Sequence, residues 1–320
     1  MADDLVQTMI LVARMYYLDG LDQQQIAEIV GTSRSRVSRM LTAARERGIV
    51  RISVDEYEPR DLVLEAALIE RFGLHRAVVV RVFSEQPETV RRAVGYFAAP
   101  ALSDLLQSGT TVGVAGGRTL RELVNHLEPC ERSSTITVTQ LMGNIGPATD
   151  QIDAIELSRA LAQHVSGAFY TLNAPVLAQN KAARDLLMAH DHIRTITSLF
   201  SNLDVAFVGV GTLEDSAFLE RGVFSRNEMA ALRAQGAVGE ICGRFFDRNG
   251  EECDTDYRDR VISISLDVLR SRPEIVAVTH GSHRGEAIRA ALQGRLITSL
   301  VIDEHGARSL LGDRPTKRAA

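Results

Sequence analysis

From residue 77 onward, seven short runs of apolar, largely β-branched residues recur along the chain, and helix-like stretches separate them. A run this short and this continuously apolar is typical of a strand that is buried on both faces, as in parallel sheets. Parallel neighbours also need crossover connections, which the intervening helices supply. The pattern therefore predicts a doubly wound, mostly parallel α/β domain, with strands at 77–82, 111–115, 135–141, 168–172, 205–210, 275–279 and 299–302.

Amphipathic stretches fill most of the intervals between these runs. Their apolar residues recur at three- and four-residue spacing, which is typical of helices that lay one face on a sheet. One such stretch precedes the first strand and could cover the sheet or help to form a dimer. The predicted helices are 61–72, 88–107, 118–127, 152–165, 181–200, 227–235, 261–271 and 284–293.

The first 55 residues follow a different pattern, which predicts a small helical domain. Residues 5–18 are mostly apolar and are expected to form one helix. A second helix begins after Asp22, whose carboxylate can accept orphan backbone N–H groups. It ends at Gly31, because glycine adopts a left-handed conformation at little cost. The apolar face of this helix is expected to consist of Ile26, Ala27, Ile29 and Val30.

The third helix follows Ser33, a second capping residue, and its two faces differ in character. Val37, Met40 and Leu41 recur at helical spacing and predict a buried stripe, whereas the opposite face carries arginine and serine. A guanidinium can pair bidentately with the edge of a guanine, and a short hydroxyl lets the backbone approach DNA. Two short helices around a tight turn, with such a face, predict a helix-turn-helix domain that binds double-stranded DNA.

The distribution of charge supports the same interpretation. Residues 34–51 contain six arginines and one glutamate, a net charge of +5, whereas the whole chain carries −5. A basic patch on an acidic protein indicates an electrostatic footprint for nucleic acid. The alternative, a helical hairpin with a solvated basic face, does not explain why caps, turn glycine and apolar spacing agree. The predicted DNA contacts are Gln23, Ser33, Arg34, Ser35, Arg36, Ser38, Arg39 and Arg51.

Two features mark the end of this domain. Residues 49–54 alternate like a short strand and could form a wing beside the helices, with Arg51 on its outer face. Residues 56–60 are polar and contain Pro59, which places a linker there. We therefore expect a winged helix-turn-helix domain at 1–55, a linker at 56–60 and a larger ligand-binding domain at 61–320.

Composition argues against several classes of protein. With 320 residues, 45% of them hydrophobic and 24% charged, the chain has an ordinary globular composition. Its three cysteines form no C-x-x-C pair, and no apolar run approaches the roughly 18 residues of a membrane span. We expect a cytoplasmic protein without structural disulfides, cofactor or metal. His280 and His283 lack a third metal ligand at a helpful spacing.

Glycines gather where four of the predicted strands end. They lie at or after the ends of the strands at 111–115, 135–141, 205–210 and 275–279. In a parallel sheet these ends share one edge, where the ligands of such folds bind. Glycine there permits close approach of a polar ligand, and the helix N-termini that follow favour an anion. Each loop alone is weak evidence, but the four together predict a ligand site.

Taken as a whole, the chain resembles the SorC-type sugar-binding transcriptional regulators, which are related to DeoR-like sensors of sugar phosphates. Five blocks in the same order carry the resemblance: 13–27 (ARMYYLDGLDQQQIA), 112–120 (VGVAGGRTL), 172–175 (LNAP), 208–213 (VGVGTL) and 241–247 (ICGRFFD). It implies an effector domain similar to sugar-phosphate isomerases and deaminases. The loops and the resemblance together suggest effector contacts at Gly117, Arg118, Thr119, Gly143, Asn144, Asn173, Gly211, Asp259, Gly281 and Arg284.

The resemblance also implies a homodimer or homotetramer whose hold on DNA changes when a sugar, polyol or sugar phosphate binds. Where the family commonly has a glycine pair followed by lysine, this chain has His280, Gly281 and Arg284, so that a forked guanidinium replaces a point charge. A free polyol and a pentitol phosphate both stay open as effectors. Asp247 either accepts a sugar hydroxyl or, as we prefer, begins a turn at 247–250.

The sequence thus predicts a DNA-binding regulator of a carbohydrate or polyol catabolic operon. We expect a repressor, because repression is commoner than activation for this arrangement. The alternative is a sugar-phosphate isomerase-like enzyme fused to a DNA-binding domain. Isomerisation needs a positioned base and a proton relay, and the sequence identifies no such acid–base cluster at the glycine-rich edge. A third alternative, a structural DNA-binding protein, leaves the glycine-edged sheet without a role.

Overall fold

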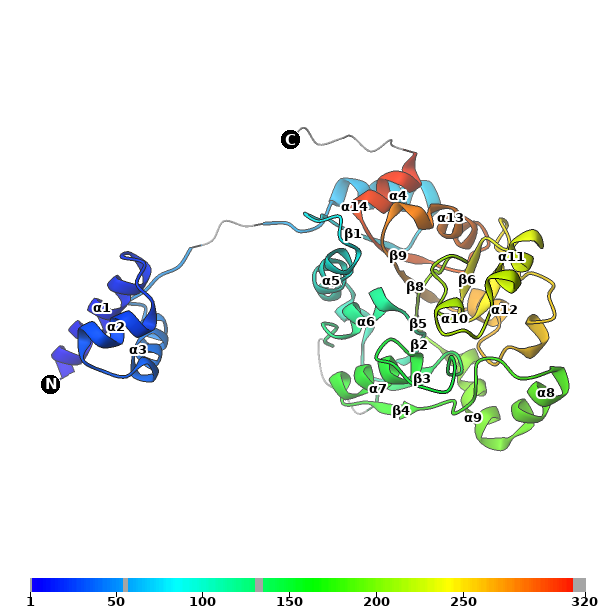
Figure 1. Cartoon of the computed structure of the whole chain (residues 1–320), viewed down its shortest axis with the longest axis horizontal. Coiled ribbons are helices and arrows are strands. Elements are labelled where there is room, and N and C mark those ends of the chain that lie inside the picture. Colours follow the sequence, from blue (N-terminus) through cyan, green and yellow to red (C-terminus); the bar gives the residue numbers. More distant parts are fainter. Residues whose placement is uncertain (1, 54–56, 130–134, 313–320) are drawn as a thin grey trace. The chain divides into compact units, whose positions relative to one another are not determined.

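The structure of the protein, a computed structural model, describes residues 2–53, 57–129 and 135–312. The chain divides into two compact units, Met1–Tyr57 and Glu58–Ala320 (Figure 1). The division falls within the range 56–60, where the sequence predicts a linker. Within the described ranges, no helix combines the length and the apolar character needed to cross a membrane.

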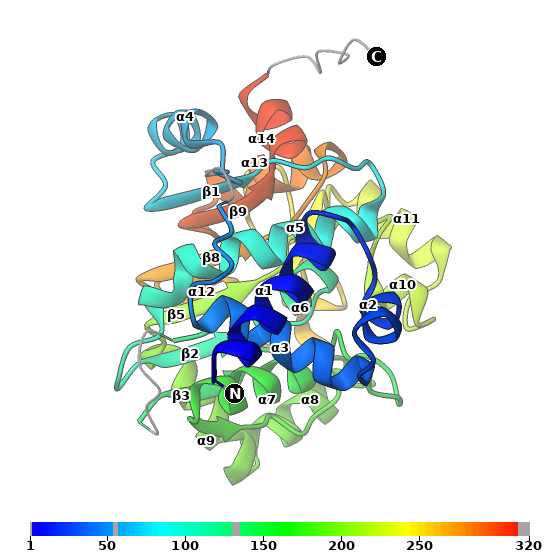
Figure 2. The ribbon, with the colours of Figure 1, turned by 90° about the vertical axis from the view of Figure 1, so that its left-hand side faces the viewer.

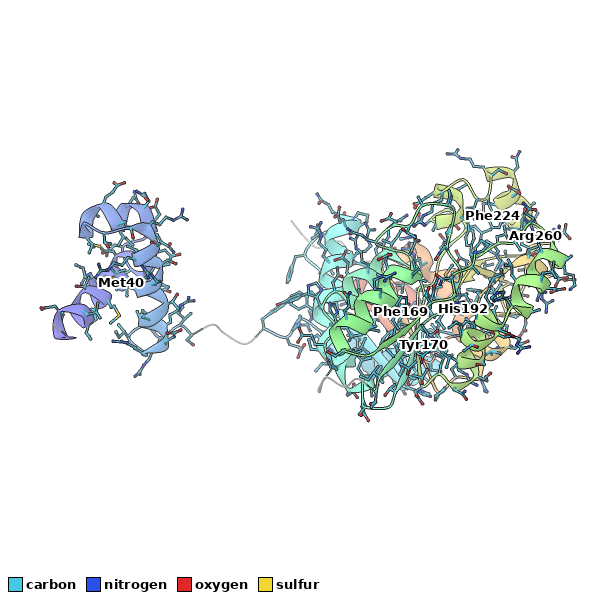
Figure 3. All side chains as sticks on the ribbon, turned by 90° about the horizontal axis from the view of Figure 1, so that it is seen from below. Met40, Phe169, Tyr170, His192, Phe224 and Arg260 are labelled. Carbon is cyan, nitrogen blue, oxygen red and sulfur yellow. The ribbon has the colours of Figure 1, made fainter. Side chains whose placement is uncertain are left out.

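The first unit contains three helices, α1 (Ala2–Tyr17), α2 (Gln23–Val30) and α3 (Arg34–Glu46), which are blue in Figure 2. One face of each helix contributes to a shared core, and Val12, Ile26 and Val37 are fully buried in it. Met40 of α3 adds its side chain to the same core (Figure 3). The three helices that the sequence predicts are therefore confirmed.

Two expectations for this unit are wrong. Residues 49–53 form no strand, because Ile49 and Val50 pack against the helical core and the described part of the unit offers no strand to pair with them. Val54, the last residue of the predicted wing, lies outside the described residues. Ile29 leaves the apolar face of α2 and is 59% exposed, because this short helix buries only the stripe around Ile26 and Ala27.

The second unit is built on a sheet of seven parallel strands in the order β1-β9-β8-β5-β2-β3-β4. Val112 pairs with Val138 on one side and with Val205 on the other, which places three predicted strands in register. The sheet confirms the predicted parallel α/β fold, and each predicted strand is present. The strands are β1 (Arg76–Val80), β2 (Thr111–Val114), β3 (Thr137–Gln140), β4 (Ala168–Tyr170), β5 (Val205–Val208), β8 (Glu274–Val278) and β9 (Ser299–Asp303).

Helices cover both faces of this sheet. Figure 1 shows α5 (Pro87–Ala98), α6 (Arg118–Val124) and α7 (Ala154–Val165) on one side, and α12 (Leu266–Arg270) and α13 (Gly285–Gln293) on the other. The chain runs from β2 outward through β3 and β4, then returns to β5 and continues outward through β8 and β9. The sheet therefore has a topological switch point between β2 and β5, and the connections diverge there.

Several predicted helices have different bounds in the structure. The predicted helix at 181–200 is two helices, α8 (Lys181–Ala189) and α9 (Asp191–Leu199), which meet at His190. The helix predicted at 261–271 is wrong in its first half, because the β-branched residues Val261 and Ile262 are extended and Val261 bridges to Leu177. The second half of the helix predicted at 88–107 is the 3-10 helix η1 (Ala99–Leu105).

The remaining elements include a small antiparallel hairpin, β6 (Gly239–Ile241) with β7 (Arg244–Phe246), and the last helix, α14 (Glu304–Leu311). The sequence predicts neither. The other helices are α4 (Leu62–Phe72), η2 (Phe200–Asn202), α10 (Ala217–Glu220), α11 (Arg226–Ala234), η3 (Arg258–Arg260) and η4 (Ser282–Arg284).

Gly95 allows α5 and α6 to cross closely, because a Cβ added to it would lie 2.3 Å from the Glu122 carbonyl carbon. We expect Gly95→Ala to lower the free energy of unfolding of the second unit by about 1–3 kcal/mol, since α6 must shift to admit the methyl group. Urea denaturation measures this change.

Gly285→Ala is the matched control, because Gly285 also lies in a helix but its added Cβ would meet only side-chain atoms, Ser309 Oγ at 3.4 Å and the Arg289 guanidinium from 3.5 Å. The better helix propensity of alanine should make this variant neutral or more stable by about 0.5–1 kcal/mol. Equal midpoints for the two variants would contradict the close crossing of α5 and α6.

Candidate nucleic-acid interface and ligand pocket

Local hydrogen bonds fix the turn between α2 and α3. Asp22 accepts the backbone N–H groups of Gln24 and Gln25, and the Gln25 side chain accepts the Asp22 N–H, which completes a capping box. Gly31 ends α2 in a left-handed conformation with φ of 67°. Ser33 then accepts the Arg36 N–H and begins α3. The sequence predicts each of these caps, and together they set where α3 starts.

The outer face of α3 carries exposed arginines. Among the described residues, none of the six arginines at 34–51 has a carboxylate within ion-pair distance, and the ion pair found in this unit joins Arg14 to Asp19 at 3.9 Å. Exposed guanidinium groups without partners are free to bind phosphates or base edges. The exposed residues of this face are Arg34, Ser35, Arg36, Ser38 and Arg39.

Three further predicted DNA contacts flank this face. Ser33 is exposed at the N-terminal end of α3, and Arg51 is exposed after the helix. Gln23 is half-buried at the start of α2. In helix-turn-helix proteins the N-terminal residues of the second helix contact base edges, while the first helix crosses the phosphate backbone. The positions of Ser33 and Gln23 fit these two roles.

A pocket lies at the carboxyl edge of the sheet, between the loops that follow β2, β3, β5 and β8. Its volume of about 120 Å³ is several times the ~10–15 Å³ that one water molecule needs. The pocket includes the switch point between β2 and β5, where the ligands of doubly wound folds bind. Six of the predicted effector contacts line it: Gly117, Arg118, Thr119, Gly143, Gly211 and Arg284.

Arg284 and His280 form a buried polar group in this pocket. The Arg284 guanidinium donates to the His280 carbonyl oxygen at 2.9 Å and to the Asp215 carboxylate at 3.0 Å. His280 Nδ1 lies 3.0 Å from the Thr119 hydroxyl oxygen. Burial, together with the nearby Arg284 charge, lowers the pKa of His280 to about 3. The imidazole is therefore neutral at neutral pH, and Arg284 rather than His280 supplies positive charge here.

Glu240 brings a carboxyl group to the pocket from β6. Its main chain pairs in both directions with Gly211, so that β6 runs beside the loop after β5. Its Oε1 accepts the Gly243 N–H at 2.9 Å. Burial raises the pKa of Glu240 to about 7, although hydrogen bonds from Gly243 and Ser216 oppose the shift. Glu240 can therefore either donate a hydrogen bond to a ligand hydroxyl or accept one near neutral pH.

Arg221 and Thr279 each present a buried polar atom that forms no hydrogen bond with the described residues, although Arg221 Nη2 lies 3.9 Å from the Asp150 carboxylate. Arg221 Nη1 lies 2.7 Å from Asp153 and donates to the Ile145 carbonyl oxygen at 2.9 Å. Within the described residues, however, Arg221 Nη2 and the Thr279 hydroxyl have no hydrogen-bond partner. Both residues line the pocket. Because buried polar groups are seldom left unpaired, these two atoms indicate a ligand or water in the pocket.

Four predicted effector contacts do not line this pocket, and two of them support its loops instead. The Gly281 N–H donates to the Asp303 carboxylate. Asn144 Oδ1 accepts from Gln140 Nε2 at 3.0 Å, which ties the loop after β3 to its own strand. These two residues therefore position neighbours that line the pocket.

The other two are Asn173 and Asp259. Asn173 is exposed in a left-handed conformation with φ of 46°. Asp259 lies in the 3-10 helix η3, and the Lys181 ammonium, 2.9 Å away, lowers the pKa of this exposed carboxyl below its ordinary value. The turn that we prefer for Asp247 is confirmed, because its carboxylate accepts the N–H groups of Asn249 and Glu251.

Sequence reasoning missed Thr279 and four charged residues that line the pocket: Asp153, Asp215, Arg221 and Glu240. Glu240 gives a usable signal, because it is a charged residue beside the apolar pair Ile241 and Cys242. Asp153, Asp215 and Arg221 give none, since they lie in polar segments that look like ordinary surface loops. Their place in the pocket depends on how the long connections fold back over the sheet.

Comparisons with known proteins identify the family. Residues 59–312 match a family model described as "Putative sugar-binding domain". The chain is 34% identical to the deoxyribonucleoside regulator of Bacillus subtilis over 311 residues, which cover 96% of this chain and 98% of that protein. It is 30% identical to the sorbitol operon regulator of Klebsiella pneumoniae, again over 96% of this chain and 98% of that protein.

A solved structure agrees with these matches. The crystal structure of the full-length sorbitol operon regulator SorC from Klebsiella pneumoniae superimposes with a TM-score of 0.73 at 31% identity, covering 97% of this chain and 99% of that one. These relatives are regulators of transcription, which decides against the enzyme alternative. The chain belongs to the SorC/DeoR family of sugar-binding transcriptional regulators.

Proposed function

We propose that this regulator represses a carbohydrate or polyol catabolic operon in the cytoplasm and releases or rearranges on its operator when a small ligand fills the pocket. The carrying observation is that one chain combines two features. Exposed arginines of α3 have no carboxylate within ion-pair distance among the described residues, and a polar pocket contains buried atoms that form no hydrogen bond with those residues. The ligand is a sugar, a polyol or a sugar phosphate. A coupling of about 1–3 kcal/mol would change operator affinity about 5- to 150-fold.

The DNA contacts proposed are Ser33 and the exposed residues of α3, with Gln23 and Arg51 beside them. We propose a homodimer or homotetramer, because two copies of one short recognition helix read a palindromic operator with two-fold symmetry. Arginine at 34, 36 and 39 suits both guanine edges and phosphates. The short side chains of the serines between them allow this face of the helix to enter the major groove.

Arg36→Ala tests the DNA face. The variant should lose about 1–3 kcal/mol of specific operator binding if Arg36 contacts a base, or lower the salt slope by about 1 if it contacts a phosphate. Fluorescence anisotropy over a salt series, on an operator selected in vitro with the wild-type protein, distinguishes the two.

Arg92→Ala is the matched control for Arg36→Ala. Arg92 is an exposed arginine of α5 that pairs with Glu88. Its replacement changes the net charge by the same amount as Arg36→Ala but leaves α3 unaltered. Operator binding that stays unchanged in Arg36→Ala would remove Arg36 from the interface.

The pocket residues suit a polyhydroxylated ligand. The Glu240 carboxyl, the Thr279 hydroxyl and the Arg221 guanidinium can each bond a hydroxyl group. Arg284 offers a cation to a phosphate or other anionic group. We therefore propose Arg221, Glu240 and Thr279 as effector contacts, in addition to Thr119 and Arg284.

A thermal-shift screen tests the effector site. The panel contains sorbitol, 2-deoxyribose, their terminal phosphates and inorganic phosphate. A ligand at 100 times its dissociation constant should stabilise the folded protein by about 2.7 kcal/mol. Stabilisation by phosphorylated compounds alone would indicate that Arg284 binds the phosphate of the effector. Stabilisation by a free polyol would indicate that the effector is neutral.

Two variants sharpen this screen. Arg284→Gln should abolish stabilisation by a phosphorylated compound. Arg248→Gln should preserve it, because Arg248 is exposed, pairs with Glu286 and does not line the pocket. If no compound of the panel stabilises the wild-type protein, the proposed choice of ligands is wrong.

The raised pKa of Glu240 predicts a specific pH dependence of stability. The folded protein holds the Glu240 proton up to about pH 7, whereas the unfolded chain loses it near the ordinary value of about 4.3. The folded state thus binds more protons between these values, so Glu240 makes the free energy of unfolding fall as pH rises through this window. Its contribution levels off above about pH 7.

Glu240→Gln keeps the size and an acceptor oxygen but does not titrate. Subtracting the variant's free energy of unfolding from that of the wild type should give a value that decreases from pH 4.5 to 7 and is then constant. Urea denaturation of both proteins at closely spaced pH values measures it. A difference that stays flat across the window would show that Glu240 ionises normally.

A further inference from the structure

A single buried carboxylate, that of Asp303 at the end of β9, holds together two elements beside the pocket. Asp303 is 1% exposed. Its Oδ1 accepts the N–H groups of His305 and Gly306, at 3.0 and 3.1 Å, and so caps α14. Its Oδ2 accepts the N–H of Gly281. One oxygen therefore starts α14 and the other anchors the loop that leads to Arg284.

The start of α14 also packs directly against that loop. A Cβ added to Gly306 would lie 3.2 Å from the Gly281 carbonyl oxygen, and 2.5 Å from the Ile302 side chain. The 3-10 helix η4, which ends with Arg284, also contacts α14. The loop and the helix therefore have little room to move independently of each other.

On its other side α14 contacts α4, the helix that follows the entry of the chain into the second unit. Figures 1 and 2 both show α14 beside α4 at the same end of the sheet. Arg308 of α14 lies 3.8 Å from the Asp61 carboxylate and 4.0 Å from Glu304. Asp61 in turn caps α4 by accepting the Leu64 N–H at 3.2 Å.

We propose that Asp303 is a positioning residue that couples occupancy of the pocket to the start of α4. A ligand bound to Arg284 restrains the loop at 279–284, Asp303 transmits that restraint to α14, and Arg308 transmits it to Asp61. Residues 58–62 lie where the chain arrives from the DNA-binding unit. The inference rests on the proposed function, because it requires that a ligand in the pocket alters operator binding.

Asp303 could instead be a helix cap alone, and Asp303→Asn separates these roles. Asparagine caps helices as well as aspartate does, so its oxygen keeps the bonds to His305 and Gly306. Its amide nitrogen would then face the Gly281 N–H, and two donors cannot bond each other. The variant therefore cuts the tie to the loop and leaves α14 capped.

The experiment measures operator affinity of the full chain with and without saturating sorbitol 6-phosphate or 2-deoxyribose 5-phosphate, and hydrogen exchange of peptides covering 58–72. In the wild type we expect the probe that binds to change operator affinity by about 5- to 150-fold and to alter exchange in α4. In Asp303→Asn the probe should still bind, but the ratio of operator affinities should fall toward one and α4 should no longer respond.

Two further variants keep the test decisive if Asp303→Asn folds poorly. Arg308→Gln removes the half-buried guanidinium that contacts Asp61, and it should uncouple the sites in the same way. Ser265→Ala removes the cap of α12, where Ser265 accepts the Val268 N–H, and should leave the coupling intact. This control reports any loss that comes from reduced stability alone.

The outcomes separate the inference from the proposed function. If the wild type responds to a probe and both Asp303→Asn and Arg308→Gln keep its full ratio of affinities, the coupling role of Asp303 is wrong while the proposed function stands. If the wild type binds neither probe, or binds one without a change in operator affinity, the proposed function fails for these ligands and the coupling fails with it.

Discussion

Parallel pairing of seven strands is the constraint on which the second unit depends. Each parallel pair needs a crossover, so every strand ends at the same edge of the sheet. The strands that follow β2 and the strands that follow β5 lie on opposite sides of this point, so the connections diverge there and leave a crevice at the carboxyl edge. Residues far apart in sequence meet there as a result: Thr119 and His280 are hydrogen-bonded at 3.0 Å.

The two units treat positive charge in opposite ways. In the second unit the arginines with little exposure have partners, as in the contacts of Arg244 with Glu252 at 2.7 Å and of Arg284 with Asp215 at 3.0 Å. Burial makes such pairing necessary, because an uncompensated buried charge is strongly destabilising. The arginines of α3 are exposed and gain little from a partner in the same chain. Among the described residues no carboxylate lies within ion-pair distance of them, which costs the fold almost nothing and leaves them available to DNA.

The sequence predicts what depends on neighbouring residues and misses what depends on how loops fold back. The caps at Asp22 and Ser33 and the parallel strands follow from local spacing and apolar runs, and the structure confirms them. Gly143 shows the limit of what local spacing can predict. A Cβ there would lie 2.5 Å from the Pro175 backbone, so the missing side chain makes room for another loop of the protein. Arg221 lies in the pocket only because a long polar connection returns over the sheet, which no spacing rule reports.

The contacts of Arg284 explain how this arginine could hold its own loop and also bind the proposed ligand. One nitrogen, Nη1, holds the His280 carbonyl oxygen, while Nη2 binds the Asp215 carboxylate, whose side chain is 42% exposed. An anionic ligand group could exchange with Asp215 at Nη2, where Asp215 Oδ2 also lies 3.0 Å from His283 Nε2. The bond to His280 survives the exchange and keeps the loop in place. A lysine has a single nitrogen, and it would have to divide its hydrogen bonds between the loop and the ligand.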